Sequence, residues 1–346
     1  MSALNKGLNN MGNEAKEDNV GVLNLYAGSR PFFAVIIPVY NKEQHVAKAI
    51  DSVLRQTYKN FELIIVCDPS DDQSKDKVYQ FNDPRIQVFH RDQPGPGGYA
   101  ARNLGMRNAT ASWITFLDAD DEWFLDRLAY HKSLIDRTNL KVICSSWRDV
   151  YENGSESTAA RLLEEPLSAS KFFKVYRKES RVVCTNTITF HKTIFDAIGG
   201  FPENRYARGG DVSTWVRIID YAGEVYRSTR ETAYYNKSNS TVTKAIDPSI
   251  SHNAVYEMCV EISKRRRMHP LYRLTLAKLS NKHLRYGLVC RIKKGEIRIS
   301  DLKYYSFWAN PLSYVSFLFL SMLPDMFIRN VVIKVLKIKK YFRRIF

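Results

Sequence analysis

From Phe33 to about residue 120, short apolar runs alternate with segments in which apolar residues recur at helical spacing. Four of the apolar runs are predicted strands: Phe33–Pro38, Leu63–Cys67, Ile86–His90 and Trp113–Leu117. Continuous apolar runs of this length are typical of strands that are buried on both faces of a parallel sheet. This part of the chain is therefore predicted to be the core of a folded domain.

The segments between these strands predict helices. The first is expected after Asn41, a plausible N-cap with Gln44 three residues later, and the others near residues 72–81 and 99–108. Strands that alternate with single helices imply right-handed crossovers. The predicted fold class is α/β: a Rossmann-like, mostly parallel sheet with helices on both faces.

Beyond residue 120 the pattern becomes less regular. A helix is expected to begin at Trp123, a strand to cover residues 182–190 and another helix to cover residues 212–221. After Thr243 the sequence turns helical and basic. This change predicts a helical extension that follows the α/β domain.

Positive charge is concentrated at one end of the chain. The 346 residues include 52 Lys and Arg against 36 Asp and Glu, a net charge of +16. Residues 251–346 alone contain 20 basic and 5 acidic residues, or +15, which leaves +1 for residues 1–250. A basic surface confined to one end indicates an acidic partner for that end, either a membrane or a nucleic acid.

The last residues favour a membrane surface over a nucleic acid. If residues 330–346 are helical, apolar side chains lie on one face and Lys and Arg on the other, as in a helix that rests on an anionic leaflet. The alternative is a solvated basic helix packed on the core. The apolar stretch at 311–323 is shorter than the roughly 20 residues that a transmembrane helix needs. The chain is therefore not expected to span a bilayer.

The cysteines and the N-terminal residues bear on location. Five cysteines at wide, irregular spacing suggest neither a disulfide framework nor a zinc site, and favour a reducing compartment. Residues 1–30 lack an apolar run of secretory length and are expected to be a flexible tail. The expected location is the cytoplasm, peripheral on the cytoplasmic face of the cell membrane.

The expected divisions of the chain are 1–30 (tail), 31–243 (α/β domain), 244–310 (basic helical extension) and 311–346 (amphipathic membrane-associating segment).

Polar side chains follow three of the predicted strands. Pro38, Tyr40 and Asn41 come after the first strand, Asp68, Ser70 and Asp72 after the second, and Asp118, Asp120 and Asp121 after the fourth. Ligands of open parallel sheets bind at this carboxyl edge. Carboxylates crowded there raise one another's pKa unless a cation lies among them, and oxygen ligands of this kind suit Mg or Mn.

Taken with Ala101-Arg-Asn-Leu-Gly105, these motifs resemble those of family 2 glycosyltransferases with the GT-A fold. The resemblance covers about residues 33–240, and it implies the non-processive type that builds bacterial cell-surface polysaccharides, because the Gln-x-x-Arg-Trp signature of processive members is absent. It implies that Pro38 and Tyr40 line the nucleotide, that Asp68 accepts a hydrogen bond from uracil and that Arg102 lies near the phosphates. The alternative role for Asp68 is a helix cap, and for Arg102 a surface salt bridge.

The resemblance also implies the metal site and the base. Asp118-Ala-Asp120 matches the family's DXD motif, so Asp120 would hold a divalent Mn or Mg ion while Asp118 reaches the ribose or the metal. Asp211 matches the catalytic base that removes the acceptor's proton. The usual acidic neighbour of that base is Gly210 here, and an aspartate often found two positions later is Ser213. A helix N-cap is the alternative role for Asp211.

The resulting expectation is an inverting glycosyltransferase that moves a hexose or N-acetylhexosamine from a nucleotide sugar, UDP-linked, to an acceptor hydroxyl on a lipid-linked saccharide. Its expected partners are this donor, the acceptor and an anionic membrane surface, with no nucleic acid. One alternative is a catalytically silent nucleotide-sugar-binding membrane scaffold. A nucleotidyltransferase is less favoured because no Gly-rich, Lys/Arg-containing phosphate loop follows the first strand. The absence of G-x-G-x-x-G after Pro38 argues against a dinucleotide oxidoreductase.

Overall fold

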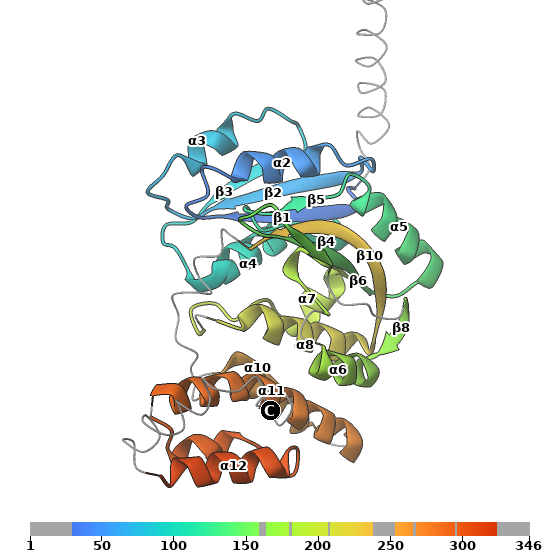
Figure 1. Ribbon diagram of the computed structural model, residues 1–346. Helices are drawn as coiled ribbons and strands as arrows, with labels where there is room; N and C mark the ends of the chain where they lie inside the picture. The colour runs from blue at the N-terminus through green and yellow to red at the C-terminus, as the bar shows by residue number, and fades with distance from the viewer. Residues whose placement is uncertain are drawn as a thin grey trace, which may run out of the picture.

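The computed structural model describes residues 30–158, 164–179, 182–206, 208–237, 253–265, 268–294 and 296–323. Three parts of the predicted divisions fall outside these residues: the tail up to residue 29, the boundary near residue 243 and the terminal segment from residue 324. Figure 1 shows one large sheet with helices on both sides, and further helices stacked below it.

The described strands form one sheet of ten, in the order β3-β2-β1-β4-β9-β6-β10-β5, with β7 paired to β6 and β8 to β10. Their bounds are β1 (Phe33–Val39), β2 (Phe61–Cys67), β3 (Ile86–His90), β4 (Trp113–Phe116), β5 (Glu122–Trp123), β6 (Val142–Val150), β7 (Glu156–Thr158), β8 (Glu165–Ser168), β9 (Ile188–His191) and β10 (Glu224–Asn236).

The first half of the sheet is wholly parallel. β1 pairs in parallel with both β2 and β4, and β2 pairs in parallel with β3. The carboxyl ends of these strands therefore meet at one edge. Beyond β4 the sheet is mixed, because β9 runs antiparallel to its neighbours β4 and β6. The predicted α/β class, a mostly parallel sheet with helices on both faces, is confirmed, with the antiparallel pairs beyond β4.

Helices cover both faces of the sheet. Their bounds in the α/β part are α2 (Val46–Leu54), α3 (Ser74–Tyr79), α4 (Tyr99–Asn108), α5 (Arg127–Thr138), α6 (Ala169–Lys178), α7 (Lys192–Ile198) and α8 (Gly210–Ala222). Along β1, Ala34 and Ile36 belong to one buried core while Val35 and Ile37 belong to the other. A strand buried on both faces needs apolar residues at every position, which explains the continuous apolar run.

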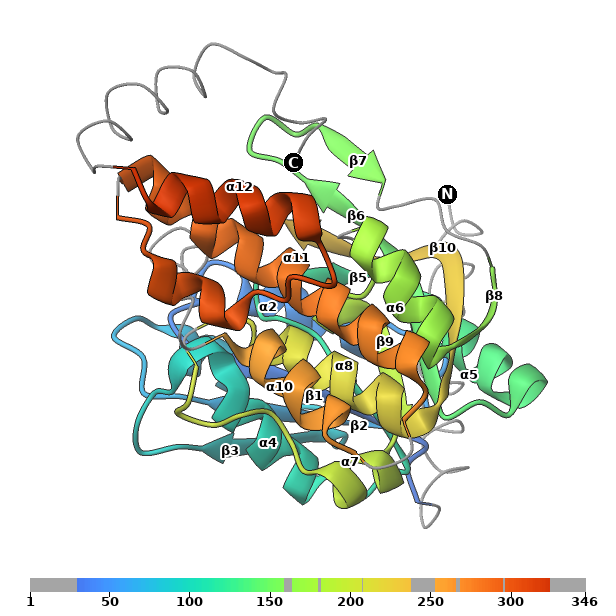
Figure 2. The same ribbon diagram turned by 90° about the horizontal axis from the view of Figure 1, so that it is seen from below.

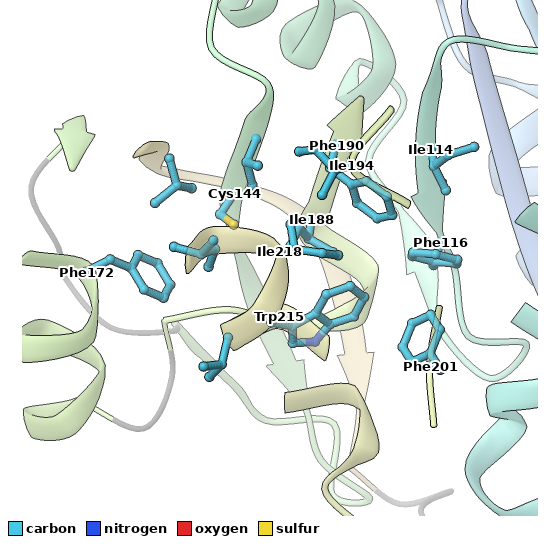
Figure 3. Packing of buried hydrophobic residues seen from close by; sticks show 14 of the residues in the cluster. Ile114, Phe116, Cys144, Phe172, Ile188, Phe190, Ile194, Phe201, Trp215 and Ile218 are labelled. Carbon is cyan, nitrogen blue, oxygen red and sulfur yellow. The ribbon is translucent and has the colours of Figure 1, made fainter. Parts of the chain in front are cut away.

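One of the two cores fixes helix α8 against the sheet. Figure 3 shows Trp215 of α8 pointing toward Phe116 of β4 and toward Phe201. The rings of Phe201 and Trp215 meet edge to face with centroids 5.3 Å apart, and those of Phe116 and Phe201 are 5.5 Å apart. Edge-to-face aromatic pairs stabilise a fold by more than the burial of their apolar area alone. This packing places the start of α8 at the carboxyl edge of the parallel strands.

The C-terminal helices pack onto the α/β part. The predicted basic extension contains α10 (Ala254–Ser263), α11 (Pro270–Lys294) and a 3-10 turn η3 (Ile299–Tyr304), and the segment predicted from residue 311 begins with α12 (Pro311–Ser321). Val255 and Ile262 of α10 and Leu276 of α11 belong to the same buried core as Trp215. Helices α10 and α11 are therefore continuous with the core of the α/β part. No described helix has the length and apolarity needed to cross a bilayer.

Three local predictions differ from the structure. Asn41 does not cap α2, which begins at Val46; it has a left-handed φ of 51° and its side chain accepts a hydrogen bond from Asp71 N–H. No helix begins at Trp123, because residues 122 and 123 pair with β10 and the helix starts at Arg127. The expected strand at 182–190 is limited to β9, since Thr185–Thr187 form a 3-10 turn.

Candidate active site

The loop after β1 lies between the loops that follow β2 and β4. The Asp68 N–H donates to the Val39 carbonyl at 2.9 Å, and the Lys42 Nζ donates to an Asp120 carboxylate oxygen at 2.7 Å. Asp68 and Asp120 therefore flank a single loop at the same edge of the sheet. On that edge Pro38 is half-buried, whereas Tyr40 exposes its side chain.

Asp68 is a buried carboxylate paired with a cation. Arg91, the residue directly after β3, donates from Nη1 to Asp68 Oδ1 at 2.7 Å. Burial raises the pKa of Asp68, and the charge of Arg91 opposes that shift. The structure does not support helix capping by Asp68, because α3 starts at Ser74 and its first amide bonds Asp72 instead. The Asp68 side chain is thus held at the strand end, where a ligand base could meet it.

Arg102 joins the glycine-rich segment to the acidic motif. Its Nη1 donates to the Gly97 carbonyl at 2.7 Å, and its Nη2 donates to Asp118 Oδ1 at 2.5 Å. Gly98 has a left-handed φ of 66°, and a Cβ there would lie 3.5 Å from the Cβ of Pro38. The predicted nucleotide residues Pro38 and Arg102 therefore both border this glycine. Arg102 is buried, so the predicted alternative of an exposed salt bridge does not describe it.

The three aspartates after β4 have different surroundings. Asp118 pairs with Arg102 and Asp120 pairs with Lys42. Asp121 is buried and accepts hydrogen bonds from the Asn236 backbone N–H at 2.7 Å and from the Asn186 side chain. Burial raises the pKa of Asp121 well above its usual value, and the neighbouring Asp120 and Asp118 charges add to the rise. Asp121 therefore fixes the turn that presents the other two carboxylates.

Asp211 lies in the first turn of α8 and is only partly exposed. Burial raises the pKa of its carboxyl; the Val212 N–H and the charge of Arg102 oppose the shift, and the charge of Asp118 adds to it. The Gly210 N–H donates to the hydroxyl of Tyr99, and Tyr99 and Arg102 lie three residues apart on α4, so the start of α8 with Asp211 lies near Arg102 and its partner Asp118. A carboxylate whose pKa is raised toward neutrality suits proton abstraction.

Tyr99 explains why a glycine, Gly210, stands beside Asp211. The Gly210 N–H donates to the Tyr99 hydroxyl at 3.0 Å, and a Cβ at Gly210 would lie 2.7 Å from the Tyr99 ring. A Cβ at Gly97 would likewise lie 2.6 Å from Tyr99 Cζ. Burial raises the pKa of Tyr99 to about 12, so the phenol stays neutral. The Tyr99 ring thus takes the space that a side chain at position 210 would occupy.

Asp118 and Asp120 are the candidate ligands for a divalent ion. Asp118 and Asp120 offer hard carboxylate oxygens at one edge, the ligands that Mg or Mn prefers, and such ions commonly complete their shell with water and substrate phosphates. Among the residues that the structure describes, no three His, Cys, Asp or Glu side chains converge as a complete metal cage. In this structure Lys42 pairs with Asp120 and Arg102 pairs with Asp118, so side-chain cations neutralise both carboxylates.

Several residues of the site were not predicted from the sequence. Lys42 and Arg91 both follow parallel strands, so the rule that directed attention to the strand ends could have found them. Asn186 and Asn236 come from a 3-10 turn and from the end of β10, far along the chain. No sequence signal marks these two, because only packing brings them to Asp121.

Comparisons with known proteins agree with this geometry. Residues 34–199 match the family described as Glycosyl transferase family 2. Over 120 residues the chain is 33% identical to WfgD of Escherichia coli, named a UDP-Glc:alpha-D-GlcNAc-diphosphoundecaprenol beta-1,3-glucosyltransferase; the match covers 35% of this chain and 47% of WfgD. Three longer glycosyltransferases of Rickettsia are matched over 26 to 30% of their length.

Solved structures with the same fold include S. aureus TarS 1–349 in complex with UDP-GlcNAc, with a TM-score of 0.66 and 18% identity over 86% of this chain and 87% of that one. The mannosyltransferase PcManGT of Pyrobaculum calidifontis, in complex with GDP-Man and Mn²⁺, has a TM-score of 0.54 and 16% identity over 90% of this chain and 88% of that one. At this level of identity the two structures show a shared fold. Together with the family match, they identify residues 34–199 of this chain as a glycosyltransferase domain of family 2 with the GT-A fold.

Proposed function

We propose that the protein is an inverting glycosyltransferase that moves a hexose or N-acetylhexosamine from a UDP-linked donor to a hydroxyl of a lipid-linked saccharide. The observation that carries the proposal is that the Arg102–Asp118 pair and the start of α8, which bears Asp211, lie at the edge where Asp68 and Asp120 flank the loop after β1. Side chains that suit a nucleotide base, anionic phosphate oxygens and an acceptor proton would then lie close together. The family and the fold support a sugar-nucleotide donor.

The nucleotide would bind between the ends of β1 and β2. The Asp68 carboxylate accepts hydrogen bonds from Arg91 and from the Gly95 backbone N–H, and a remaining lone pair could accept an N–H from a uracil ring. Pro38 and the exposed Tyr40 offer a rigid turn and a ring face beside that position. UDP is favoured because this carboxylate suits the donor edge of uracil and because TarS, with the same fold, binds UDP-GlcNAc.

The diphosphate would lie between Arg102 and the Asp118-Ala-Asp120 turn. The planar guanidinium of Arg102 suits anionic phosphate oxygens, and the N–H groups near Gly97 and Gly98 open helix α4. Asp118 and Asp120 would hold a divalent ion, which supplies Lewis-acid stabilisation of the charge that develops on the departing nucleoside diphosphate. Lys42 would then be free to meet a phosphate oxygen in place of Asp120.

Transfer would occur by single displacement. The acceptor oxygen forms a bond to the anomeric carbon while the bond from that carbon to the diphosphate oxygen breaks, and the electron pair stays on the diphosphate. The acceptor's hydroxyl proton passes to the Asp211 carboxylate. Attack from the face opposite the leaving group inverts the anomeric centre. Tyr99 and Gly210 hold the start of α8, and so the position of Asp211.

A lipid-linked acceptor at the cytoplasmic face of the membrane fits two observations. WfgD, which resembles part of this chain, is named for a diphosphoundecaprenol acceptor. The basic C-terminal part of the sequence, with 20 basic and 5 acidic residues over 251–346, suits an anionic leaflet. Mn or Mg is the proposed cofactor.

The test compares wild type with Asp211→Asn and with Asp196→Asn, an exposed aspartate on α7 that serves as a matched control. A panel of UDP- and GDP-sugars with Mn²⁺ is first screened by thermal unfolding, since a ligand at 100 times its dissociation constant adds about 2.7 kcal/mol. Transfer to a polyprenyl-diphosphate N-acetylglucosamine acceptor is then measured. Asp211→Asn should lose turnover while it keeps UDP binding, and Asp196→Asn should match wild type. Undiminished turnover in Asp211→Asn refutes the base, and absence of turnover in wild type favours the silent-binder alternative.

A further inference from the structure

Helix α12 is the outermost layer of the described structure. Figures 1 and 2 show it on the far side of α11 from the sheet, at the bottom of the first view and nearest the viewer in the second. It is attached from one side only: Phe317 is fully buried, and its ring meets that of Tyr305 with centroids 5.4 Å apart. The buried cluster that holds it also includes Leu284 and Leu288 of α11. The opposite side of α12 faces solvent.

That solvent-facing side is apolar. Leu312, Val315, Phe319 and Met322 are exposed and recur at intervals of three and four residues, so they share one helical face. Trp308, just before the helix, is 82% exposed, and Leu312 is 86% exposed. Helix α12 contains no charged residue. We call Trp308, Leu312, Val315, Phe319 and Met322 the α12 face.

A contiguous apolar patch of this kind marks a binding surface. The sequence that ends in the α12 face is basic, with 9 Lys and Arg against 2 acidic residues over 268–323. A basic sequence that carries an exposed surface of Trp, Phe and Leu matches the chemistry of an anionic bilayer, where apolar side chains enter the interface, Trp lies at the headgroup level and cations meet lipid phosphates.

We infer that the α12 face inserts into the interface of an anionic bilayer and docks the protein there. This places the membrane contact on a helix that the structure describes, held to α11 by Phe317. The inference deepens the proposed function on a membrane-linked acceptor. Its test measures lipid binding, which can fail while glycosyl transfer to a water-soluble acceptor stands.

The tryptophans offer a built-in probe of this docking. Of the five tryptophans in the chain, Trp113, Trp123, Trp147 and Trp215 are at most 7% exposed, whereas Trp308 is 82% exposed. Quenching of the fluorescence by aqueous iodide therefore reports mainly on Trp308. Vesicles of phosphatidylglycerol and phosphatidylcholine in equal parts should protect Trp308 from iodide and shift its emission to the blue, and pure phosphatidylcholine should do so much less.

The variant test uses the full chain and vesicle co-sedimentation. Leu312→Glu combined with Phe319→Glu should weaken binding to the mixed vesicles at least tenfold, because two carboxylates on the α12 face oppose insertion. Leu271→Glu is the matched control: Leu271 is a 63% exposed leucine at the start of α11, outside the α12 face, and its replacement should leave vesicle binding unchanged. Unchanged UDP-induced thermal stabilisation in all variants shows that the fold is retained.

Three outcomes overturn the inference. The first is vesicle binding by the Leu312→Glu, Phe319→Glu variant equal to that of wild type. The second is iodide quenching of Trp308 that is unaffected while the protein is bound to vesicles. The third is the absence of lipid binding together with a concentration-dependent dimer that the same variant abolishes, measured by light scattering, which would assign the α12 face to a second copy of the chain.

Discussion

Replacing Gly210 with alanine should destabilise the protein, although alanine normally suits the start of a helix. The new Cβ would lie 2.7 Å from Cε2 and Cζ of Tyr99 and 3.1 Å from Cγ of Pro202. The Tyr99 ring cannot retreat, because it stacks on Phe201 with centroids 5.9 Å apart and closely borders Gly97. Helix α8 must therefore shift, and Asp211 with it.

The expected change in the free energy of unfolding is the sum of two destabilising contributions and one stabilising contribution. Overpacking a filled core costs about 1–3 kcal/mol. Loss of the hydrogen bond from Gly210 N–H to the Tyr99 hydroxyl costs about 1 kcal/mol. The smaller entropy of the unfolded chain returns about 0.4–1 kcal/mol. The free energy of unfolding should thus fall by about 1–3.6 kcal/mol, which for a domain of this size lowers Tm by about 2–14 °C.

A double-mutant cycle in urea isolates the contact. In a Tyr99→Ala background the space beside position 210 is open, so Gly210→Ala should there be neutral or slightly stabilising. The two sites should show a coupling energy of about 1–3 kcal/mol. The packing explanation of Gly210 would be refuted if Gly210→Ala lowered the free energy of unfolding equally in both backgrounds. A higher Tm for Gly210→Ala in the wild-type background would also refute it.

Further predictions concern the nucleotide, the base and the helical extension. Asp68→Asn should weaken UDP binding about 10- to 100-fold by calorimetry, because a hydrogen bond to a charged group contributes about 1.5–3 kcal/mol; unchanged affinity would remove Asp68 from the uracil site. Because burial raises the pKa of Asp211, kcat/KM should fall on the acid side of the pH profile at a pH above the pKa of an ordinary aspartate. The residual rate of Asp211→Asn should not show this fall. Burial lowers the pKa of His283 in α11 to about 4, so His283 is neutral in the folded protein while the unfolded chain takes up a proton below about pH 6.5. Stability present above pH 6.5 is then lost as pH falls toward 4, by about 2 kcal/mol at pH 5. Urea unfolding should show that His283→Gln loses less stability than wild type between pH 6.5 and pH 4. Identical stability-against-pH curves for wild type and His283→Gln would contradict this prediction.

The sequence alone determined the parallel half of the sheet and the edge at which the site lies. Ala34 and Val35 both had to be apolar because β1 is buried on both faces, and this requirement is local enough to be visible in the chain. Parallel strands bring their carboxyl ends together, so polar residues such as Asp68 and Asp120 after such strands were predicted to meet at one edge. That prediction depends only on strand direction.

Tertiary packing decided the partners of those side chains. Lys42 is 78 residues from Asp120, and Arg91 is 23 residues from Asp68, and nothing in local spacing selects these pairs. The same holds for Trp123, whose neighbourhood suggested a helix but pairs with β10 instead, because a strand partner from residues 224–236 was available.

Position 210 shows most clearly the difference between what the sequence determines and what only the tertiary structure decides. Compared with the family, the sequence has a glycine where an acidic residue is usual, and the sequence gives no reason for the difference. In the fold, Tyr99, 111 residues away, fills that space and holds the helix start through its hydroxyl. Hydrophobic pattern and strand direction are properties of a segment, so the sequence can determine them; excluded volume and pairing are properties of segments brought together, so only the tertiary structure decides them.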